Sequence, residues 1–236
     1  MKQIYKIAGK IIEISSCYET IHEYCRNYIF SGKPDFKINA AEPDINLKFT
    51  REYPSDKLDR LEILILYRKL AELMPDYDTF LMHGSAISVN GAGCVFTAPS
   101  GTGKSTHAKF LCELLKDKAL MVNDDKPLIS ASIDKKILVH GSPFNGKHKR
   151  GNNISVPLKA ICILERSEQN NIHEISYYEA YTTLLAQIYR PATHERLAKT
   201  LELLDRMNEA VKFYRLGCNM SINAAEVSYN AIMKGK

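Results

Sequence analysis

The stretch that decides the fold is Ala98-Pro99-Ser100-Gly101-Thr102-Gly103-Lys104-Ser105-Thr106. It follows the apolar run Cys94–Thr97 and precedes a helical pattern over Lys104–Leu115. A loop of small residues that joins a strand to a helix and ends in Gly-Lys-Ser is typical of a phosphate-binding loop. The sequence therefore predicts an α/β fold with an anion site at this strand–helix junction.

Each residue type in this loop suits the binding of phosphate. Small side chains let backbone N–H groups approach phosphate oxygens, and the helix N-terminus adds a partial positive charge. Lys104 can reach the terminal phosphates of a nucleotide, and Ser105 can bind Mg²⁺. The alternative interpretation is a Gly-rich turn with a surface lysine. The predicted nucleotide-binding residues are Ser100, Gly101, Thr102, Gly103, Lys104, Ser105 and Thr106.

Two adjacent carboxylates, Asp124 and Asp125, follow the apolar run Ala119–Val122 and Asn123. Neighbouring side chains that leave a strand point in different directions, so the pair can divide two tasks. One carboxylate can hold Mg²⁺ while the other accepts a proton from a hydroxyl nucleophile. Asp-Asp is also common in turns, but its position after the phosphate-binding loop favours the functional interpretation.

Two further features are weaker candidates for the site. His83 lies on the strand that enters the hairpin before the loop, where its spacing alone favours a structural histidine. The segment Gly141–Asn153 is a long loop of Gly, Asn and cationic residues, and long loops in compact domains are often functional. Lys147, Lys149 or Arg150 could offset charge on a transferring phosphate or bind an acidic acceptor, although a basic run is usually a solvated face.

Composition limits the class of protein. The 236 residues carry 45% hydrophobic and 25% charged residues, which is ordinary globular usage and excludes a disordered or coiled-coil chain. A net charge of +5 is mild for a dedicated nucleic-acid binder. Six cysteines without a CxxC pair indicate a reducing, cytoplasmic protein, and no apolar window approaches the ~18 residues of a membrane span. Neither an HExxH motif nor a Gly-x-Ser-x-Gly elbow occurs, so hydrolases of those two types are disfavoured.

The periodicity divides the chain into two parts. Residues 1–75 are expected to form a small α+β region, with strands at Ile11–Ile14 and Ile45–Phe49 and helices at Tyr18–Tyr28 and Leu61–Met74. Residues 76–236 are expected to form the nucleotide-binding domain around a mixed sheet. Its expected strands are Phe80–Val89 and Cys94–Thr97 in a hairpin, then Ala119–Asn123, Leu128–Ser132, Ile137–His140, Lys159–Glu165 and Val211–Leu216. Its expected helices are Lys104–Leu115, Tyr177–Tyr189, Thr193–Asn208 and a last helix capped by Asn223 and Glu226.

Three segments, taken in order, resemble the catalytic domain of HPr kinase/phosphorylase. They are His83–Ser85, Phe96–Thr106 and Asn123–Asp125, within a similarity that spans roughly residues 78–165. The fold of that family also resembles the nucleotide-binding core of phosphoenolpyruvate carboxykinase. The resemblance implies that Lys104 holds the β- and γ-phosphates and that Ser105 binds Mg²⁺. It further implies that one of Asp124 and Asp125 is the general base, for which we favour Asp124, while the other binds the metal.

The same resemblance places His83 near the phosphates and implies transfer of phosphate from ATP to a serine hydroxyl on a protein or peptide. Thr106 stands where the family usually has an acidic residue, and the loop Gly141–Asn153 does not match the segment tied to the phosphorylase reaction. Relatives with this core are often oligomeric, which leaves a homo-oligomer open.

Two other functions remain open at this stage. A non-catalytic module could use ATP binding to order a partner-binding surface, and the phosphate-binding loop alone does not separate it from a kinase. The pair Asp124 and Asp125 favours the kinase, because a binding module needs no base beside the γ-phosphate. Nucleic-acid binding through Lys147 to Arg150 is the third alternative, disfavoured by the mild net charge.

Overall fold

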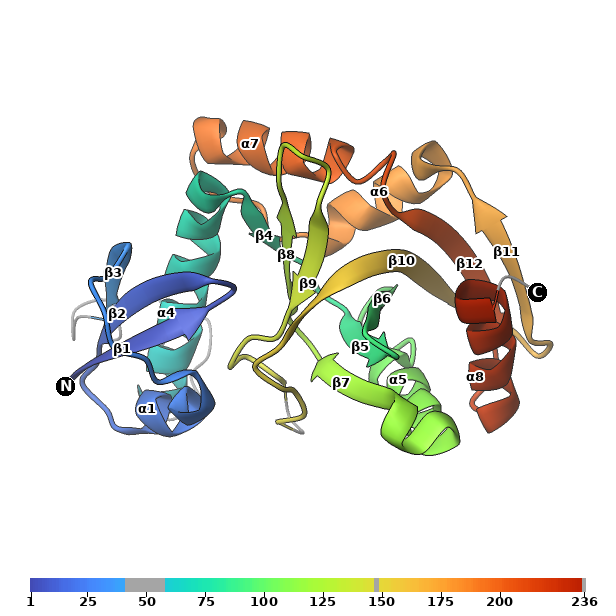
Figure 1. Cartoon of the computed structure of the whole chain (residues 1–236), viewed down its shortest axis with the longest axis horizontal. Coiled ribbons are helices and arrows are strands. Elements are labelled where there is room, and N and C mark those ends of the chain that lie inside the picture. The colour runs from blue at the N-terminus through green and yellow to red at the C-terminus, as the bar shows by residue number, and fades with distance from the viewer. Residues whose placement is uncertain (41–57, 147–148, 235–236) are drawn as a thin grey trace.

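The fold, seen in a computed structural model, contains a large mixed sheet and a small three-stranded sheet (Figure 1). The structure describes residues 1–40, 58–146 and 149–234. The expected strand at Ile45–Phe49 and the side chain of Lys147 lie outside these residues. Within them, parallel and antiparallel strand pairs occur in one sheet, so the predicted mixed α/β class is confirmed.

The large sheet has nine strands in the described part of the chain. Seven run in the order β4-β8-β9-β10-β6-β5-β7, and β12 pairs with both β10 and β11. The strands are β4 (Thr79–Leu81), β5 (Ser85–Val89), β6 (Ala92–Thr97), β7 (Ala119–Asn123), β8 (Leu128–Ala131), β9 (Ile137–His140), β10 (Ser155–Arg166), β11 (Asn171–Ile175) and β12 (Lys212–Cys218).

The long strand β10 joins the parts of this sheet. Its first residues, Ser155–Pro157, pair antiparallel with β9, and the following residues pair parallel with β6 and β12. Successive side chains of a strand point to opposite faces, and here both faces are apolar. Ile161 and Ile163 lie in one hydrophobic cluster, and Ala160 and Cys162 lie in another.

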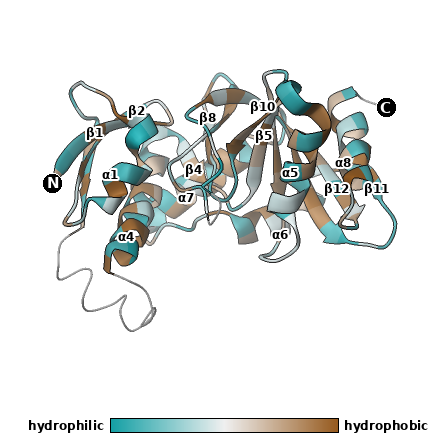
Figure 2. Cartoon of the chain, turned by 90° about the horizontal axis from the view of Figure 1, so that it is seen from below, coloured by the Kyte–Doolittle hydropathy of each residue, from teal (hydrophilic) through white to brown (hydrophobic). Residues whose placement is uncertain are grey.

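Helices cover both faces of the large sheet, as Figure 1 shows. The cluster around Ile161 includes residues of α6 (Tyr177–Gln187) and α7 (His194–Asp205). The cluster around Cys162 includes residues of α5 (Lys104–Leu115) and α8 (Ile222–Tyr229). Figure 2 shows hydrophobic positions concentrated on the strands between these helices.

The small sheet has the order β1-β2-β3 and packs on α4. Its elements are β1 (Lys2–Ile7), β2 (Lys10–Ser15), α1 (Thr20–Tyr24), β3 (Phe36–Asn39) and α4 (Leu58–Leu73). Their hydrophobic cluster also contains Leu81, Leu128 and Phe144, which belong to the large-sheet part of the chain. The small sheet therefore shares its core with segments that border the loops described below.

Several predicted boundaries are wrong for identifiable reasons. The expected strand Phe80–Val89 is two strands, β4 and β5, because the chain turns at Gly84, whose N–H donates to the carbonyl of Asp125 (3.0 Å). A side chain at Gly84 would meet the Phe96 carbonyl oxygen at 2.9 Å, so this close approach requires glycine. The hairpin between β5 and β6 forms as predicted.

The predicted cap of the last helix is also wrong. Helix α8 begins at Ile222, which places Asn223 inside its first turn, and the Asn223 Oδ1 accepts a hydrogen bond from Asn170 instead (3.0 Å). A complete capping box forms at Ser176 and Glu179, before α6. Strands β1 and β11 were not predicted, and the expected helix Tyr18–Tyr28 is broken into α1 and a 3₁₀ turn at Arg26–Tyr28.

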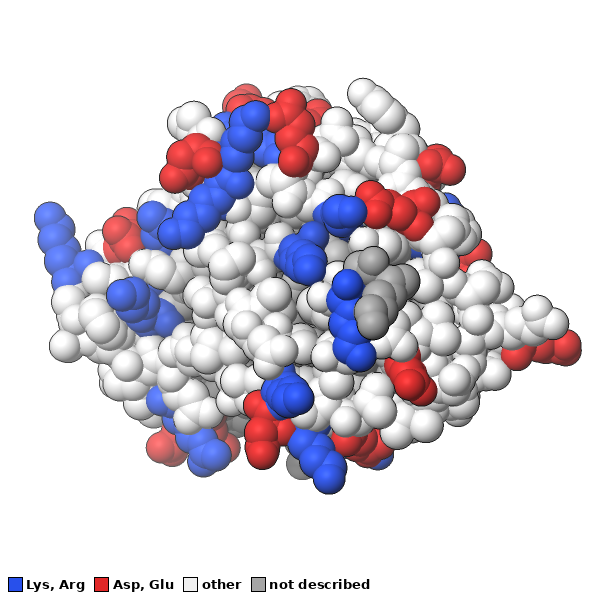
Figure 3. Space-filling model, turned by 45° about the vertical axis from the view of Figure 1, so that its right-hand side comes forward, with Lys and Arg blue, Asp and Glu red and all other residues white. Residues whose placement is uncertain are grey.

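Two global observations bear on the function classes considered above. Figure 3 shows cationic and anionic side chains side by side over the face in view. None of the helices in the described residues is both long enough and apolar enough to cross a membrane.

Candidate active site

The segment Ala98–Gly103 connects the central strand β6 to the first turn of α5. Thr97, at the end of β6, donates a hydrogen bond from Oγ1 to the carbonyl of His83 (2.9 Å), which fixes the start of the loop. Gly101 and Gly103 have φ values of +79° and +112°, a region that favours glycine. The loop therefore takes its shape from its glycines and delivers the N-terminus of α5 into a cleft.

Lys104 is buried at this N-terminus, with 7% of its surface exposed. Its ammonium donates to two carbonyls of the loop, those of Ala98 (2.9 Å) and Pro99 (3.1 Å). Burial lowers the pKa of Lys104, and the nearby Asp125 carboxylate opposes that change. A cation whose hydrogen bonds go to neutral carbonyls would gain by meeting phosphate oxygens, since hydrogen bonds between ionised groups are stronger.

The cleft in front of the loop has a volume of about 940 Å³. Its walls include Lys104, Ser105, Asp124 and Asp125, together with His83. A volume of this size lies within the usual range of roughly 300–1,000 Å³ for small-ligand sites. The cleft therefore has space for a nucleoside triphosphate beside the loop.

Arg166 is a contact of the loop that sequence reasoning missed. It ends β10 and donates from Nη2 to the carbonyl of Gly101 (2.7 Å). Because Arg166 lies 65 residues from Gly101, no local motif marks it. The bond braces the middle of the loop from the neighbouring strand.

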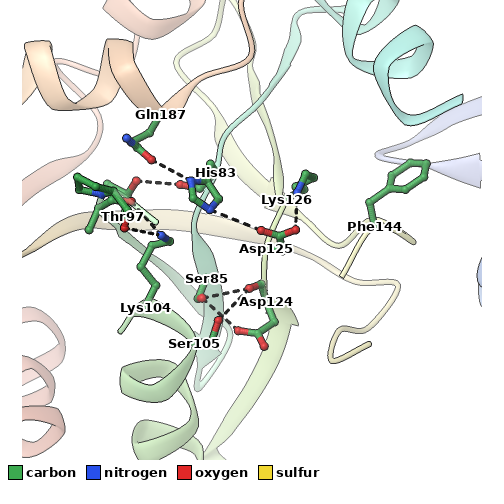
Figure 4. Close-up of polar contacts among 12 residues, drawn as sticks. His83, Ser85, Thr97, Lys104, Ser105, Asp124, Asp125, Lys126, Phe144 and Gln187 are labelled. Atoms are coloured by element: carbon green, nitrogen blue, oxygen red, sulfur yellow. Dashed lines mark hydrogen bonds and ion pairs between the residues drawn. The ribbon is translucent and has the colours of Figure 1, made fainter. Parts of the chain in front are cut away.

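Asp124 and Asp125 leave β7 and point to different partners, as predicted (Figure 4). The Asp124 side chain, in a residue that is 5% exposed, accepts a hydrogen bond on Oδ1 from the Ser85 hydroxyl (3.1 Å). The Ser105 hydroxyl donates weakly to the Asp124 carbonyl (3.4 Å). The structure thus brings Ser105 and Asp124 together from two elements.

The Asp125 carboxylate faces the other way. Its Oδ1 lies 3.6 Å from His83 Nε2, and its Oδ2 is paired with the Lys126 ammonium. Lys126 Nζ also lies 5.3 Å from the centroid of the Tyr67 ring of α4. Lys126 is a second residue that the sequence did not indicate.

His83 is positioned by two partners. Its Nδ1 lies 2.9 Å from Gln187 Oε1, and its Nε2 faces Asp125. Burial lowers the pKa of His83, and the Lys104 ammonium lowers it further, against the opposing effects of Gln187 and Asp125. The imidazole is therefore mainly neutral at pH 7. His83 lines the same cleft as Lys104, and its expected place near the phosphates stays a prediction.

Asn123 organises the turn that carries the carboxylates. Its side chain is fully buried, and its Oδ1 accepts hydrogen bonds from the backbone N–H groups of Asp125 (2.9 Å) and Lys126 (2.6 Å). Its amide nitrogen donates to the Ser142 carbonyl (3.1 Å) and to Asn145 Oδ1 (2.8 Å). One buried amide therefore connects the carboxylate turn to the loop after β9.

The loop Gly141–Asn153 does reach the site, but mainly through its backbone. The Arg150 carbonyl accepts a hydrogen bond from the Asp124 N–H (3.1 Å), whereas the Arg150 residue is exposed and is not part of the lining of the cleft. A side chain at Gly146 would lie 2.9 Å from the Asp125 Cβ, so this glycine abuts the carboxylate. The role expected for the cations of this loop stays a prediction.

The residues present are compatible with a magnesium nucleotide. No group of three or more His, Cys, Asp or Glu side chains in residues 1–40, 58–146 and 149–234 could hold a metal ion by itself. Mg²⁺ bound with a nucleotide usually takes one or two protein ligands plus phosphate oxygens and water. The donors beside the loop, the Ser105 hydroxyl and the Asp124 and Asp125 carboxylates, are of this type.

Comparisons with known proteins give a family and distant structural likenesses. A family model described as "SynChlorMet cassette protein ScmC" matches residues 54–221. Among solved structures, the Hpr(Ser) kinase/phosphatase from Coxiella burnetii matches 66% of this chain and 97% of its own chain, with a TM-score of 0.40 and 10% sequence identity. No curated protein matches the chain.

Proposed function

The chain belongs to the SynChlorMet cassette protein ScmC family, and from its cleft we propose that it is an ATP- and Mg²⁺-dependent kinase of the HPr kinase type. It transfers the γ-phosphate to a hydroxyl of serine type on a protein or peptide. The observation that carries this proposal is that Lys104, Ser105, Asp124 and Asp125 line the same cleft. In this proposal residues 76–236 form the nucleotide-binding domain, and residues 1–75 form the smaller region beside it.

The phosphate-binding loop holds the donor in this proposal. Backbone N–H groups of residues 100–106 surround the phosphates, and the Lys104 ammonium exchanges its bonds to the Ala98 and Pro99 carbonyls for bonds to the β- and γ-phosphates. Ser105 and Asp125 would hold Mg²⁺, which when bound would offset charge on the triphosphate. Burial and the Lys104 ammonium lower the pKa of His83, so among the described residues the cationic side chains that line the cleft are Lys104 and Arg166.

Asp124 is the general base. Its Oδ1 already accepts a hydrogen bond from a serine hydroxyl, that of Ser85, which is the kind of bond that an acceptor would donate. Asp125 lines the same cleft beside the phosphate-binding loop, so the metal-binding role falls to its carboxylate, which would exchange part of its contact with Lys126 for the metal. The acceptor oxygen attacks the γ-phosphorus, the bond to the β-phosphate oxygen breaks, ADP leaves, and the acceptor proton passes to Asp124.

The test is transfer of γ-labelled phosphate from Mg-ATP to peptides and small molecules of the host cell. Asp124→Asn should reduce transfer by about 10²–10⁴-fold while ATP binding persists, because the variant lacks only the base. Lys104→Ala should abolish transfer and weaken ATP binding. Asp117→Asn and Lys109→Ala are the matched controls, since both residues are exposed, and both should retain wild-type transfer.

The same experiment separates the kinase from a binding module. Full transfer by Asp124→Asn would refute the role of this residue as base. Tight binding of Mg-ATP by the wild type without transfer to any fraction would refute the kinase and favour the regulatory module.

A further inference from the structure

A second cleft lies beside the first one, between the small-sheet region and the loop after β9. It has a volume of about 620 Å³. We call it the N-terminal cleft. One wall comes from residues 19–28 and includes Glu19, Glu23 and Tyr28, while the other comes from residues 143–153.

The two clefts meet at Asn145. This residue lines both, and its Oδ1 accepts a hydrogen bond from Asn123 (2.8 Å), the residue that holds the carboxylate turn. The next residue, Gly146, lies against Asp125. A chain seated in the N-terminal cleft would therefore end next to the carboxylates and the phosphate-binding loop.

The walls of the N-terminal cleft are tied to each other. Asn153 donates from Nδ2 to the carbonyl of Asn27 (3.0 Å), and the Lys149 ammonium lies 4.4 Å from the centroid of the Tyr24 ring. These contacts join segments more than a hundred residues apart in the sequence. The cleft is therefore a built feature of the fold and leads to the catalytic loops.

The lining indicates what would bind there. Glu19, the N-cap of α1, and Glu23, in the helix itself, are exposed and four residues apart, a spacing at which like charges repel. Neither forms an ion pair within the described residues. A cation between them would relieve this repulsion. The cations Arg26 and Lys149 also line the cleft, so its charges balance as a whole, and the preference for a basic residue is local to the space between Glu19 and Glu23.

Tyr28 provides an independent observation. The residue is 3% exposed and lines the cleft, and its hydroxyl has no hydrogen-bond partner in the part of the chain that the structure describes. An unmade hydrogen bond of a buried group costs free energy. A polar group of a bound chain could supply the missing partner.

We propose that the N-terminal cleft binds the acceptor as an extended peptide with a basic residue facing Glu19 and Glu23, and presents its hydroxyl at Asn145. This inference rests on the proposed kinase function, and it names the acceptor class and the surface that selects it. A nucleic acid fits less well, because its phosphates would face the same two carboxylates. Much of the selective wall lies in residues 19–28, which are outside the segment matched by the family model.

The test measures binding and transfer separately. Short fluorescein-labelled peptides with one serine, flanked by Lys, by Glu or by Ala, are titrated with the full chain by fluorescence anisotropy. We expect the Lys-flanked peptide to bind about fivefold more tightly than the Ala-flanked one, as exposed ion pairs permit. In the double variant Glu19→Gln, Glu23→Gln this preference should vanish, while the Kd for Mg-ATP stays unchanged. Glu202→Gln, an exposed residue on α7, is the control and should keep the preference.

Equal binding of the three peptides, tighter binding of the Glu-flanked one, or a preference retained in the double variant would each overturn the assignment. The comparison of the three peptides on the wild-type chain does not depend on how the double variant folds. The unchanged Kd for Mg-ATP checks that the variant is folded. Charge-dependent binding without phosphate transfer would support the cleft and refute the kinase. Transfer that ignores peptide charge would support the kinase and refute the cleft.

Discussion

Replacement of Asn123 by alanine should lower both the stability of the protein and its phosphate transfer. The substitution removes the acceptor of the Asp125 and Lys126 N–H groups. It also removes the donor to the Ser142 carbonyl and to Asn145 Oδ1. Asn123 is fully buried, so water cannot readily replace the hydrogen bonds that its side chain makes.

The magnitude follows from the number of groups left without a partner. Each buried polar group that loses its hydrogen bond costs about 1–3 kcal/mol. The two N–H groups alone therefore predict a loss of about 2–6 kcal/mol. The loss of transfer has a separate cause, because the turn that aims Asp124 and Asp125 loses its fixed geometry.

Urea unfolding and steady-state kinetics measure the two effects. Asn123→Asp is the informative second variant, because its Oδ1 still accepts from both N–H groups while its other oxygen now faces acceptors of Ser142 and Asn145. It should keep more of the turn geometry than Asn123→Ala but bury a charge. Asn208→Ala, at an exposed position, is the control. An unfolding free energy of Asn123→Ala within about 0.5 kcal/mol of wild type would refute the reasoning.

Three other predictions concern the same loops and the sheet beneath them. Gly141→Ala should destabilise the protein by about 1–3 kcal/mol in urea, because the new Cβ would lie 1.8 Å from a backbone carbonyl oxygen; an unchanged midpoint would contradict this. Lowering the pH from 7 to 5 should reduce the unfolding free energy by about 2 kcal/mol for each of His107 and His140, whose burial lowers the pKa to about 4. Only the unfolded state gains these protons as the pH falls through 6.5, so this contribution to stability is full above that pH and is lost toward pH 4. If a variant lacking either histidine showed the same dependence of the unfolding free energy on pH as the wild type, the prediction would be refuted. Arg166→Ala should raise the KM for ATP about fivefold without changing stability, because it removes the bond to Gly101; an unchanged KM would show that the brace is not needed.

The sequence identified the parts of the fold that local patterns determine. Helix α5 and strands β7 and β9 have the predicted limits. In each of them a regular pattern of apolar residues marks the element, and residues typical of turns or loops lie next to it. Strand β11 was missed because its Asn171–Ile175 run is mostly exposed and lacks a strong apolar pattern. The first residues of β10 were missed because Pro157 lies in them, and only the pairing with β9 makes that segment a strand.

In the candidate site, too, the sequence indicated the features that local motifs mark and missed those that depend on tertiary contacts. The loop and the carboxylate pair form contiguous motifs, so the sequence could indicate them. Arg166 and Gln187 lie far along the chain from the groups they contact, and no pattern of spacing records a contact made by tertiary folding. Asn123 could have been found, since a polar residue that ends an apolar strand must have a buried partner, but its partners could not.

The core shared between the two sheets has an evolutionary consequence. Leu81, Leu128 and Phe144 lie in one hydrophobic cluster with residues of the small sheet and α4, so exchange of residues 1–75 for an unrelated module would uncover apolar surface next to the loops of the cleft. An exchange at the proposed boundary would therefore require changes at these three positions as well. The two parts are therefore expected to be inherited together. If residues 19–28 select the acceptor as proposed, new preferences would arise by point substitution at exposed positions there, where changes leave the common core intact.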